Sequence, residues 1–428
     1  MFVRDGKVVT SPSDLSAAAA CEWAFLRELD ARLGRIDAPP RTEDPMLRRA
    51  AELGDKHEVA VLDRLREQHA VVVEIPRPDV RDEASLAEAV ERTQQALAEG
   101  ADVVFQATFA DEDMIGFADF LVRQRDGSYQ VQDSKLARSA KVTALLQLAA
   151  YAEQLARTGV AVAPSAVLIL GDGTRSEHAL ADVVPVFRER RAHLRRLVAE
   201  RLADDAPLAW GDARYLACGR CEVCEPAAEA ARDLVLVAGM RSTTRARLMA
   251  GGVTTIDELA RRTEPVPGVS ASTLAALRTQ ARLQLEATDG APPPFELVDP
   301  GAVATLPVPD PGDIFFDFEG DPLYAEPGEE DETRWGLDYL FGLVEADGTF
   351  RAFWAHSLAE EREALREFLD YLTERRARFP GMHVYHYAPY ERTHLLSIAA
   401  RHGVCEEEVD DLLREAVLVD LFPVVRGA

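Results

Sequence analysis

Apolar and polar residues alternate most regularly between Gly116 and Lys135, where the sequence reads GFADFLVRQRDGSYQVQDSK. The alternation runs on both sides of Asp126-Gly127, and Asp-Gly is a favoured two-residue turn, so this stretch predicts a β-hairpin. The pattern around it predicts the elements of an α/β domain, in the order helix 48–69, strand 70–75, helix 86–98, strand 102–110, hairpin, helix 142–155, strand 165–170 and helix 186–202.

The first residues predict a second, shorter hairpin over 2–9, which turns at Asp5-Gly6. A helix should follow, because Ser11-Pro12-Ser13-Asp14 supplies N-cap residues and a proline suited to a first turn. We expect this helix to include Cys21.

The second half of the chain predicts three further segments. Short helices with glycine turns fill 233–286, and the proline-rich stretch from Ala291 to Pro311 predicts a linker. An apolar strand from Ile314 opens another α/β unit, with strands expected at 335–344, 349–355 and 383–386. The expected division of the chain is a domain over 1–225, a helical unit over 226–290, a linker over 291–311 and an α/β unit over 312–428.

Composition narrows the class of protein. The chain has 428 residues, 47% of them apolar, and a net charge of −26. This charge argues against a surface that coats nucleic acid broadly, since such binding neutralises phosphates, but it leaves room for a local basic groove. Apolar runs are too short for a transmembrane helix, so we expect a cytoplasmic protein without a membrane partner.

Candidate catalytic residues lie on the central hairpin. Asp133 and Lys135 are two residues apart, so they share a strand face while Ser134 points away, and Asp119 lies on the other arm. Two carboxylates would repel each other unless a cation lay between them, and Mg²⁺ prefers oxygen ligands. The parts suit metal-assisted phosphodiester hydrolysis. The alternative is an exposed hairpin with a surface ion pair, because the tripeptide D-x-K is common.

Two flanking features favour the catalytic interpretation. Gln147 and Tyr151 are four apart on a predicted helix, and His57 lies in another. With Asp119 and the Asp133–Lys135 pair, the series resembles the RecB-like branch of the PD-(D/E)xK nucleases over roughly residues 11–225. The resemblance implies a restriction-endonuclease-like core and Mg²⁺ or Mn²⁺. It also implies roles for the matching residues: metal ligands His57, Asp119 and Asp133, and catalytic residues Asp119, Asp133, Lys135, Gln147 and Tyr151.

Three of the five cysteines form C-x-x-C-x-x-C, at Cys218, Cys221 and Cys224. Clustered thiolates usually bind metal, and a fourth ligand is needed for a tetrahedral site or a cubane cluster. Cys21 can supply it. This arrangement resembles RecB-like nucleases in which one early and three late cysteines hold a 4Fe–4S cluster. Zinc and free thiols remain alternatives, and Cys405 is isolated.

Two segments predict contact with DNA. Helix 186–202 carries six arginines that form either a DNA-guiding strip or a solvated face balanced by acids: Arg188, Arg190, Arg191, Arg195, Arg196 and Arg201. The glycine turns at Gly251-Gly252 and Gly268 resemble helix-hairpin-helix motifs, which bind DNA phosphates without reading sequence. The alternative is a helical spacer that contacts only protein.

The last unit resembles the DEDD (DnaQ-like) exonucleases, which have an RNase H-like fold. Asp317 and Glu319 end its first strand, and Glu391 and Asp420 match later positions. The final motif of that family is missing, so we expect no complete two-metal site here. The alternatives are a fragment of a longer chain, which we favour, and an inactive domain; proteins of this kind often continue into a helicase.

The sequence thus predicts a metal-dependent deoxyribonuclease that acts on single-stranded DNA ends in repair or recombination. A non-catalytic DNA-binding adaptor and an RNA-processing nuclease are the other hypotheses. The intact set of Asp119, Asp133, Lys135 and Gln147 argues against the adaptor, because an unpaired cluster of charges is a liability.

Overall fold

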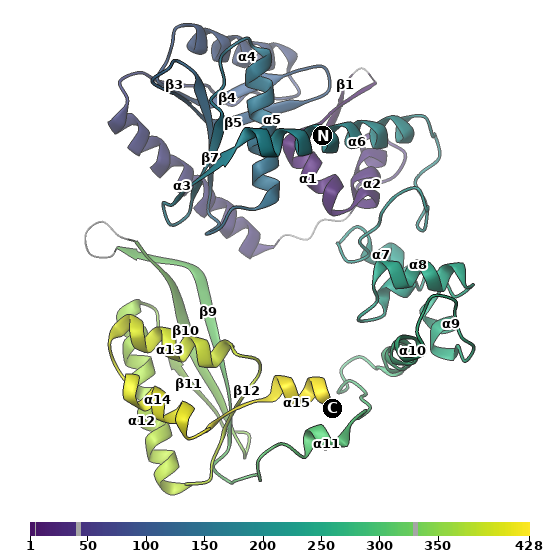
Figure 1. Ribbon diagram of the computed structural model, residues 1–428, viewed down its shortest axis with the longest axis vertical. Helices are drawn as coiled ribbons and strands as arrows, with labels where there is room; N and C mark the ends of the chain where they lie inside the picture. Colours follow the sequence, from purple (N-terminus) through teal and green to yellow (C-terminus); the bar gives the residue numbers. More distant parts are fainter. Residues whose placement is uncertain (5, 40–43, 328–332) are drawn as a thin grey trace. The chain divides into compact units, whose positions relative to one another are not determined.

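The computed structural model describes residues 1–4, 6–39, 44–327 and 333–428. The chain divides into two compact units, Met1–Pro294 and Phe295–Ala428, and the boundary falls inside the predicted linker (Figure 1). The predicted turn at Asp5-Gly6 lies partly outside the described residues. In the described ranges, no helix has the length and apolar character needed to cross a membrane.

A six-stranded mixed sheet forms the centre of the first unit in the described residues. Its spatial order is β3 (Val72–Glu74), β4 (Val103–Ala110), β5 (Ile115–Arg123), β6 (Tyr129–Lys135), β7 (Ser165–Leu170) and β8 (Arg175–Ala179). The predicted hairpin is confirmed as β5–β6, with Gly127 at φ 85° in its turn, a conformation that favours glycine. Strand β8 was not predicted, because its sequence RSEHA has no apolar pattern.

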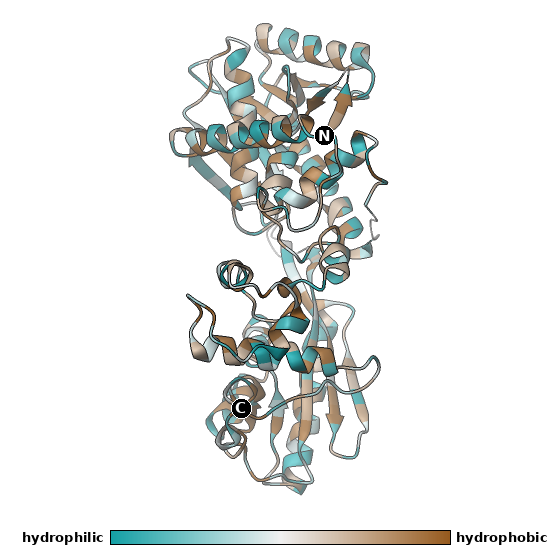
Figure 2. Ribbon diagram, turned by 90° about the vertical axis from the view of Figure 1, so that its right-hand side faces the viewer, coloured by the Kyte–Doolittle hydropathy of each residue, from teal (hydrophilic) through white to brown (hydrophobic). Residues whose placement is uncertain are grey.

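Helices cover both faces of this sheet. On one face, α3 (Pro45–Gln68) packs Val61, Leu62 and Leu65 against alternate residues of the strands. On the other face, α4 (Glu83–Ala98) and α5 (Val142–Arg157) pack against the strand residues that point away from α3. Figure 2 shows largely hydrophobic strands and helices of mixed character, as expected when each helix buries one stripe. The predicted α/β class is therefore confirmed.

A smaller assembly packs beside the sheet. It joins the hairpin β1 (Phe2–Arg4) and β2 (Lys7–Val9) to helices α1 (Pro12–Ala20), α2 (Glu22–Arg32) and α6 (Leu180–Leu202). The prediction that the first helix includes Cys21 is wrong, because Cys21 separates α1 from α2 in an extended conformation. Its sulfur accepts a hydrogen bond from the Ala24 backbone N–H at 3.4 Å, so the cysteine acts as the N-cap of α2.

The arginines of α6 mostly find partners inside this unit. Arg201 is 0% exposed, and its Nε lies 2.7 Å from Oδ1 of Asp30, which is equally buried. Among the described residues, the arginine ion pairs of the helix include Arg188 with Glu153, Arg191 with Asp111 and Asp113, Arg195 with Asp113, and Arg201 with Asp30 and Asp204. These contacts favour the balanced face over a DNA-guiding strip.

Short helices complete the first unit: α7 (Glu225–Ala230), the 3₁₀ helix η1 (Leu234–Leu236), α8 (Ser242–Ala250), α9 (Ile256–Arg261) and α10 (Ala271–Glu286). They share a core of their own that includes Leu248, Leu259 and Ala281. Gly252 and Gly268, both at φ 78°, make the turns before α9 and α10. The glycine turns therefore lie between helices as predicted, and their DNA contact stays a prediction.

The second unit contains, in its described part, a five-stranded sheet in the order β11-β10-β9-β12-β13. Its strands are β9 (Ile314–Pro327), β10 (Thr333–Glu345), β11 (Phe350–Trp354), β12 (Val384–His386) and β13 (Leu418–Asp420). Strands β9 to β11 are antiparallel, and β12 and β13 run parallel to β9. The helices of this unit are α11 (Pro300–Val303), α12 (Leu358–Arg378), α13 (Tyr390–His402), α14 (Glu406–Arg414) and α15 (Leu421–Gly427).

Candidate active site and cysteine cluster

A buried carboxylate and a lysine end strand β6. Asp133 is 1% exposed, because β6 lies between β5 and β7 and is packed by helices on both faces. Its Oδ2 lies 2.5 Å from Nζ of Lys135 and accepts no well-formed hydrogen bond from the described residues. A buried carboxylate oxygen with only an ion-pair partner is costly, so this oxygen is suited to bind a further cation.

Asp119 lies beside this pair on β5. The last ladder pair before it is Phe120 with Gln132, so Asp119 lies just beyond the paired part of the hairpin, close enough to Asp133 for its charge to raise the pKa of that residue. The Asp119 Oδ2 accepts hydrogen bonds from Ser134, from its backbone N–H at 2.9 Å and its Oγ at 3.1 Å. The β5–β6 ladder ends at Gln132, and this frees the Ser134 N–H for the carboxylate. Ser134 faces away from Asp133, as predicted, because its β7 partner Ile169 packs in the core against α3, whereas Leu168, the partner of Asp133, packs in the core against α5.

Glu58, on α3, is an acidic neighbour that the sequence analysis did not single out. Its carboxylate accepts a hydrogen bond from Nε2 of Gln106. Burial and then the charge of Asp119 raise the pKa of Glu58, and its own charge acts on Asp133. The sequence could have indicated Glu58, because this acid directly follows His57 on an amphipathic helix.

His57, the predicted metal ligand, lies at the same edge of the sheet but contacts the backbone. Its Nε2 is 3.2 Å from the carbonyl oxygen of Ile169, the β7 residue paired with Ser134. In the part of the chain that the structure describes, neither His57 nor Glu58 forms with Asp119 and Asp133 a group whose donor atoms all lie within 4.8 Å of one another. The structure thus brings the two aspartates and Lys135 together and leaves His57 beside them.

The electrostatics of the site favour an added cation. Burial, followed by the charge of Asp119, raises the pKa of Asp133 to about 8 despite the opposing ammonium of Lys135. Burial alone lowers the pKa of Lys135, but the charges of Asp133 and Asp119 raise it overall, so the lysine stays protonated. With Glu58, the site holds three carboxylates and one ammonium, and this excess of oxygen donors fits a hard divalent ion.

We expect the stability of the metal-free protein to fall as pH rises from about 4 to about 8. An unfolded aspartate has a pKa near 3.9, whereas buried Asp133 keeps its proton up to about pH 8, so the folded state binds more protons in this window. Asp133→Asn should weaken this decline and raise the free energy of unfolding at pH 8 by on the order of 1 kcal/mol. Urea unfolding in EDTA at pH 5 and pH 8 measures both effects; a steeper decline in the variant would contradict them.

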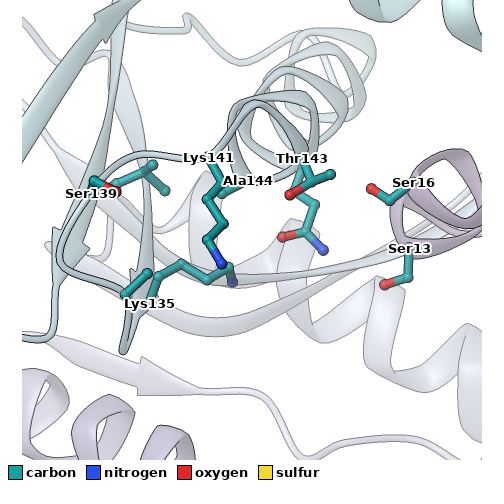
Figure 3. Close-up of a pocket in the computed structure, with 10 residues that line it drawn as sticks. Ser13, Ser16, Lys135, Ser139, Lys141, Thr143 and Ala144 are labelled. Carbon is teal, nitrogen blue, oxygen red and sulfur yellow. The ribbon is translucent and has the colours of Figure 1, made fainter. Parts of the chain in front are cut away.

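Gln147 and Tyr151 lie on the face of α5 that meets this end of the sheet. The Tyr151 ring packs on Gly116, where a Cβ would lie 2.9 Å from the ring, so glycine is required on β5. Burial, then the charges of Asp133 and Asp119, raise the pKa of Tyr151 well above its usual range and keep the phenol neutral. Gln147 and Lys135 both line a cavity of about 250 Å³ (Figure 3).

The four predicted cysteines come together in the first unit. Cys21, Cys218, Cys221 and Cys224 place their sulfur atoms within 4.8 Å of one another. The Sγ atoms of Cys21 and Cys224 are 3.4 Å apart, and this contact lowers the pKa of Cys21 to about 5 while it raises that of Cys224. Four thiols at this spacing fit a tetrathiolate metal centre.

The Cys21 region is also held by contacts that need no metal. Nε1 of Trp23 donates to the Ala209 carbonyl at 3.0 Å, and the Leu208 backbone N–H donates to Oδ2 of Asp30 at 2.8 Å. These bonds tie α2 to the segment that leads into the late cysteines. Loss of a bound metal should therefore leave this unit folded.

The acids predicted in the second unit lie near one end of its sheet. Asp317 and Glu319 line a cavity of about 400 Å³ beside β12. Oε2 of Glu391 is 3.1 Å from Nδ1 of His386, and burial first, then Asp317, raise the pKa of Glu391. Three of the four predicted acids are thus neighbours.

Asp420 has a different environment from these three. Its Oδ1 accepts hydrogen bonds from the backbone N–H groups of Ala388 at 2.9 Å and Phe422 at 2.8 Å. The carboxylate caps α15 and fixes the loop after β12, and this is a structural use of the side chain.

Comparison with known proteins agrees with the geometry of the first unit. A family model described as the PD-(D/E)XK nuclease superfamily matches residues 9–225, about half of the chain. The match spans the six-stranded sheet, the Asp119–Asp133–Lys135 group and the four cysteines. No curated protein matches the chain.

Proposed function

The chain belongs to the PD-(D/E)XK nuclease superfamily, and from this premise we propose that it hydrolyses DNA phosphodiesters with the help of Mg²⁺ or Mn²⁺, acting as an exonuclease on single-stranded ends. The observation that carries the proposal is the buried Asp133–Lys135 pair beside Asp119, with one Asp133 oxygen lacking a hydrogen bond. A merely structural ion pair would not need this second carboxylate.

Each side chain has a task in this mechanism. Asp119 and Asp133 would hold the divalent ion, with Glu58 or His57 completing the ligand set, and the ion supplies Lewis-acid stabilisation of the phosphate and activation of water. Lys135, kept protonated by its carboxylate neighbours, binds a phosphate oxygen and stabilises the charge that develops during attack. Gln147 and Tyr151 position the strand from α5.

The four cysteines would hold a metal centre that ties the two ends of the nuclease domain together. The resemblance favours a 4Fe–4S cluster. The short sulfur spacing supports zinc, because a Zn–S bond of about 2.3 Å places tetrahedral ligands about 3.8 Å apart, whereas each thiolate of a cubane binds a different iron. Iron, sulfide and zinc analysis after anaerobic purification decides between them.

Two other functions make different predictions. A DNA-binding adaptor would use the glycine turns of the helical unit to bind phosphates and would not cleave. An RNA-processing nuclease would use the same site on a different sugar. Assays with Mg²⁺ or Mn²⁺ on labelled single- and double-stranded DNA and RNA distinguish the three, and metal-dependent cleavage of single-stranded DNA is the expected result. Binding without cleavage would contradict the proposal.

We also propose that the second unit, which resembles a DEDD exonuclease, contributes no cleavage here and that a helicase domain or subunit works with the nuclease. The capping role of Asp420 supports this assignment, because Oδ1 of a carboxylate that a two-metal site would need already accepts two backbone hydrogen bonds. Asp317→Ala should leave the cleavage rate within about twofold of the parent. A loss beyond about tenfold, measured on the same single-stranded substrate, would show that the second unit is catalytic.

A further inference from the structure

The cavity beside Lys135 is lined by donors rather than by carboxylates. It is formed by α1, the end of β6, the loop after it and the start of α5, and its polar lining residues are Ser13, Ser16, Lys135, Ser139, Lys141, Thr143 and Gln147. Figure 3 shows the Lys135 and Lys141 amino groups and the Ser13 and Ser16 hydroxyls directed toward the same space. The lining is therefore positive although the chain is strongly acidic.

Lysine is rare in this chain, which makes its presence here informative. Of 48 Lys and Arg residues, only Lys7, Lys56, Lys135 and Lys141 are lysines, and two of these four line this cavity. Lys135 is paired with Asp133. Lys141 is exposed and, among the described residues, its side chain makes no hydrogen bond or ion pair, so its charge is available to a ligand.

Backbone and hydroxyl groups add to the capacity of the cavity to bind an anion. Helix α5 begins at the cavity without a side-chain N-cap bond and without an acid in its first turn, so its positive end is not neutralised. Across from it, Ser13 and Ser16 lie one turn apart on α1. Oγ of Ser16 is buried and has no partner within the described ranges.

We propose that this cavity binds a terminal phosphate group of the nucleic-acid strand. The inference rests on the proposed nuclease function, because it places the phosphate beside Lys135. A phosphate monoester carries a charge of about −1.5 to −2, which matches two ammonium groups and a helix N-terminus. The volume of about 250 Å³ is below the roughly 300–1,000 Å³ of pockets that enclose whole small molecules, so it suits one phosphate group better than a nucleotide.

Binding in EDTA tests this proposal apart from cleavage. The probes are one fluorescent single strand with a 5′-phosphate, a 3′-phosphate or hydroxyls at both ends, and a circular strand of the same length. We expect the parent to bind one phosphorylated strand about tenfold more tightly than the hydroxyl strand, a difference of about 1.4 kcal/mol, since the cavity offers charged donors to the phosphate. Which phosphorylated strand gains affinity identifies the end that is bound.

Variants test whether the preference for a phosphorylated strand comes from the cavity. Lys141→Ala should abolish it, Lys141→Arg should retain part of it, and Lys7→Ala, a lysine outside the cavity, should leave it unchanged. Equal binding of all strands by the parent, or full preference in Lys141→Ala, would overturn the proposal. Equal weakening on the circular strand would show that the site binds internal phosphates, which also overturns it. Failure of the nuclease proposal would instead appear as absent cleavage with Mg²⁺ or Mn²⁺, whatever the binding preference.

Discussion

Replacement of Asp133 by alanine should reduce metal-dependent cleavage of single-stranded DNA by at least about a thousandfold. The carboxylate is buried at the end of a central strand, and its Oδ2, which pairs with the protonated Lys135, has no other partner among the described residues. Without it, the divalent ion loses a ligand and Lys135 loses the partner that fixes its position. Cleavage rates at saturating Mg²⁺ and Mn²⁺ measure the effect.

The matched control for this variant is Asp126→Asn, on the exposed turn of the same hairpin. It changes one carboxylate at the other end of β5–β6 and should cleave like the parent. Asp133→Ala must also remain folded by circular dichroism, so that the loss refers to chemistry. Cleavage by a folded Asp133→Ala at the parental rate would show that the active site lies elsewhere.

The sequence was sufficient for the site where the local pattern decided the structure. The β5–β6 hairpin follows from strict alternation and an Asp-Gly turn, and it carries Asp119, Asp133 and Lys135 to one edge. The hydrogen bonds that Ser134 donates to Asp119 were less predictable, because they depend on where the ladder stops. The contribution of Glu58 depends on how α3 packs over the sheet, which no periodicity within the helix reveals.

Breaks in helices were similarly difficult to predict. The run from Leu15 to Ala20 favours a helix, and nothing in its local pattern requires an end at Cys21. The break arises from tertiary contacts, since the Cys21 sulfur meets Cys224 and the Trp23 backbone N–H donates to the Leu216 carbonyl at 3.0 Å. Strand β8 is a comparable case, because its polar sequence is extended only through pairing with β7.

Replacement of Cys21 by serine should remove the bound metal from an otherwise folded protein. The four sulfur atoms form one group, and each thiolate supplies a bond that a serine hydroxyl replaces poorly. We expect the metal content to fall below about a tenth of the parental value, as it should for serine at Cys218, Cys221 or Cys224. Elemental analysis, acid-labile sulfide and visible absorption measure the loss and identify the metal. Cys405→Ser, in the second unit, is the matched control and should retain full occupancy.

We expect Cys21→Ser to lower the stability of the protein less than it would if the metal alone joined the two ends of the domain. Closing a loop of about two hundred residues contributes several kcal/mol in principle. In this protein the Asp30–Arg201 pair and the bonds of Trp23 and Leu208 already join the same segments. The variant should therefore melt cooperatively a few degrees below the parent, with roughly parental affinity of Asp119 and Asp133 for Mn²⁺. Metal content unchanged by Cys21→Ser would break the proposed link, and global unfolding of the variant would show that the metal, rather than the buried ion pair, holds the two ends together.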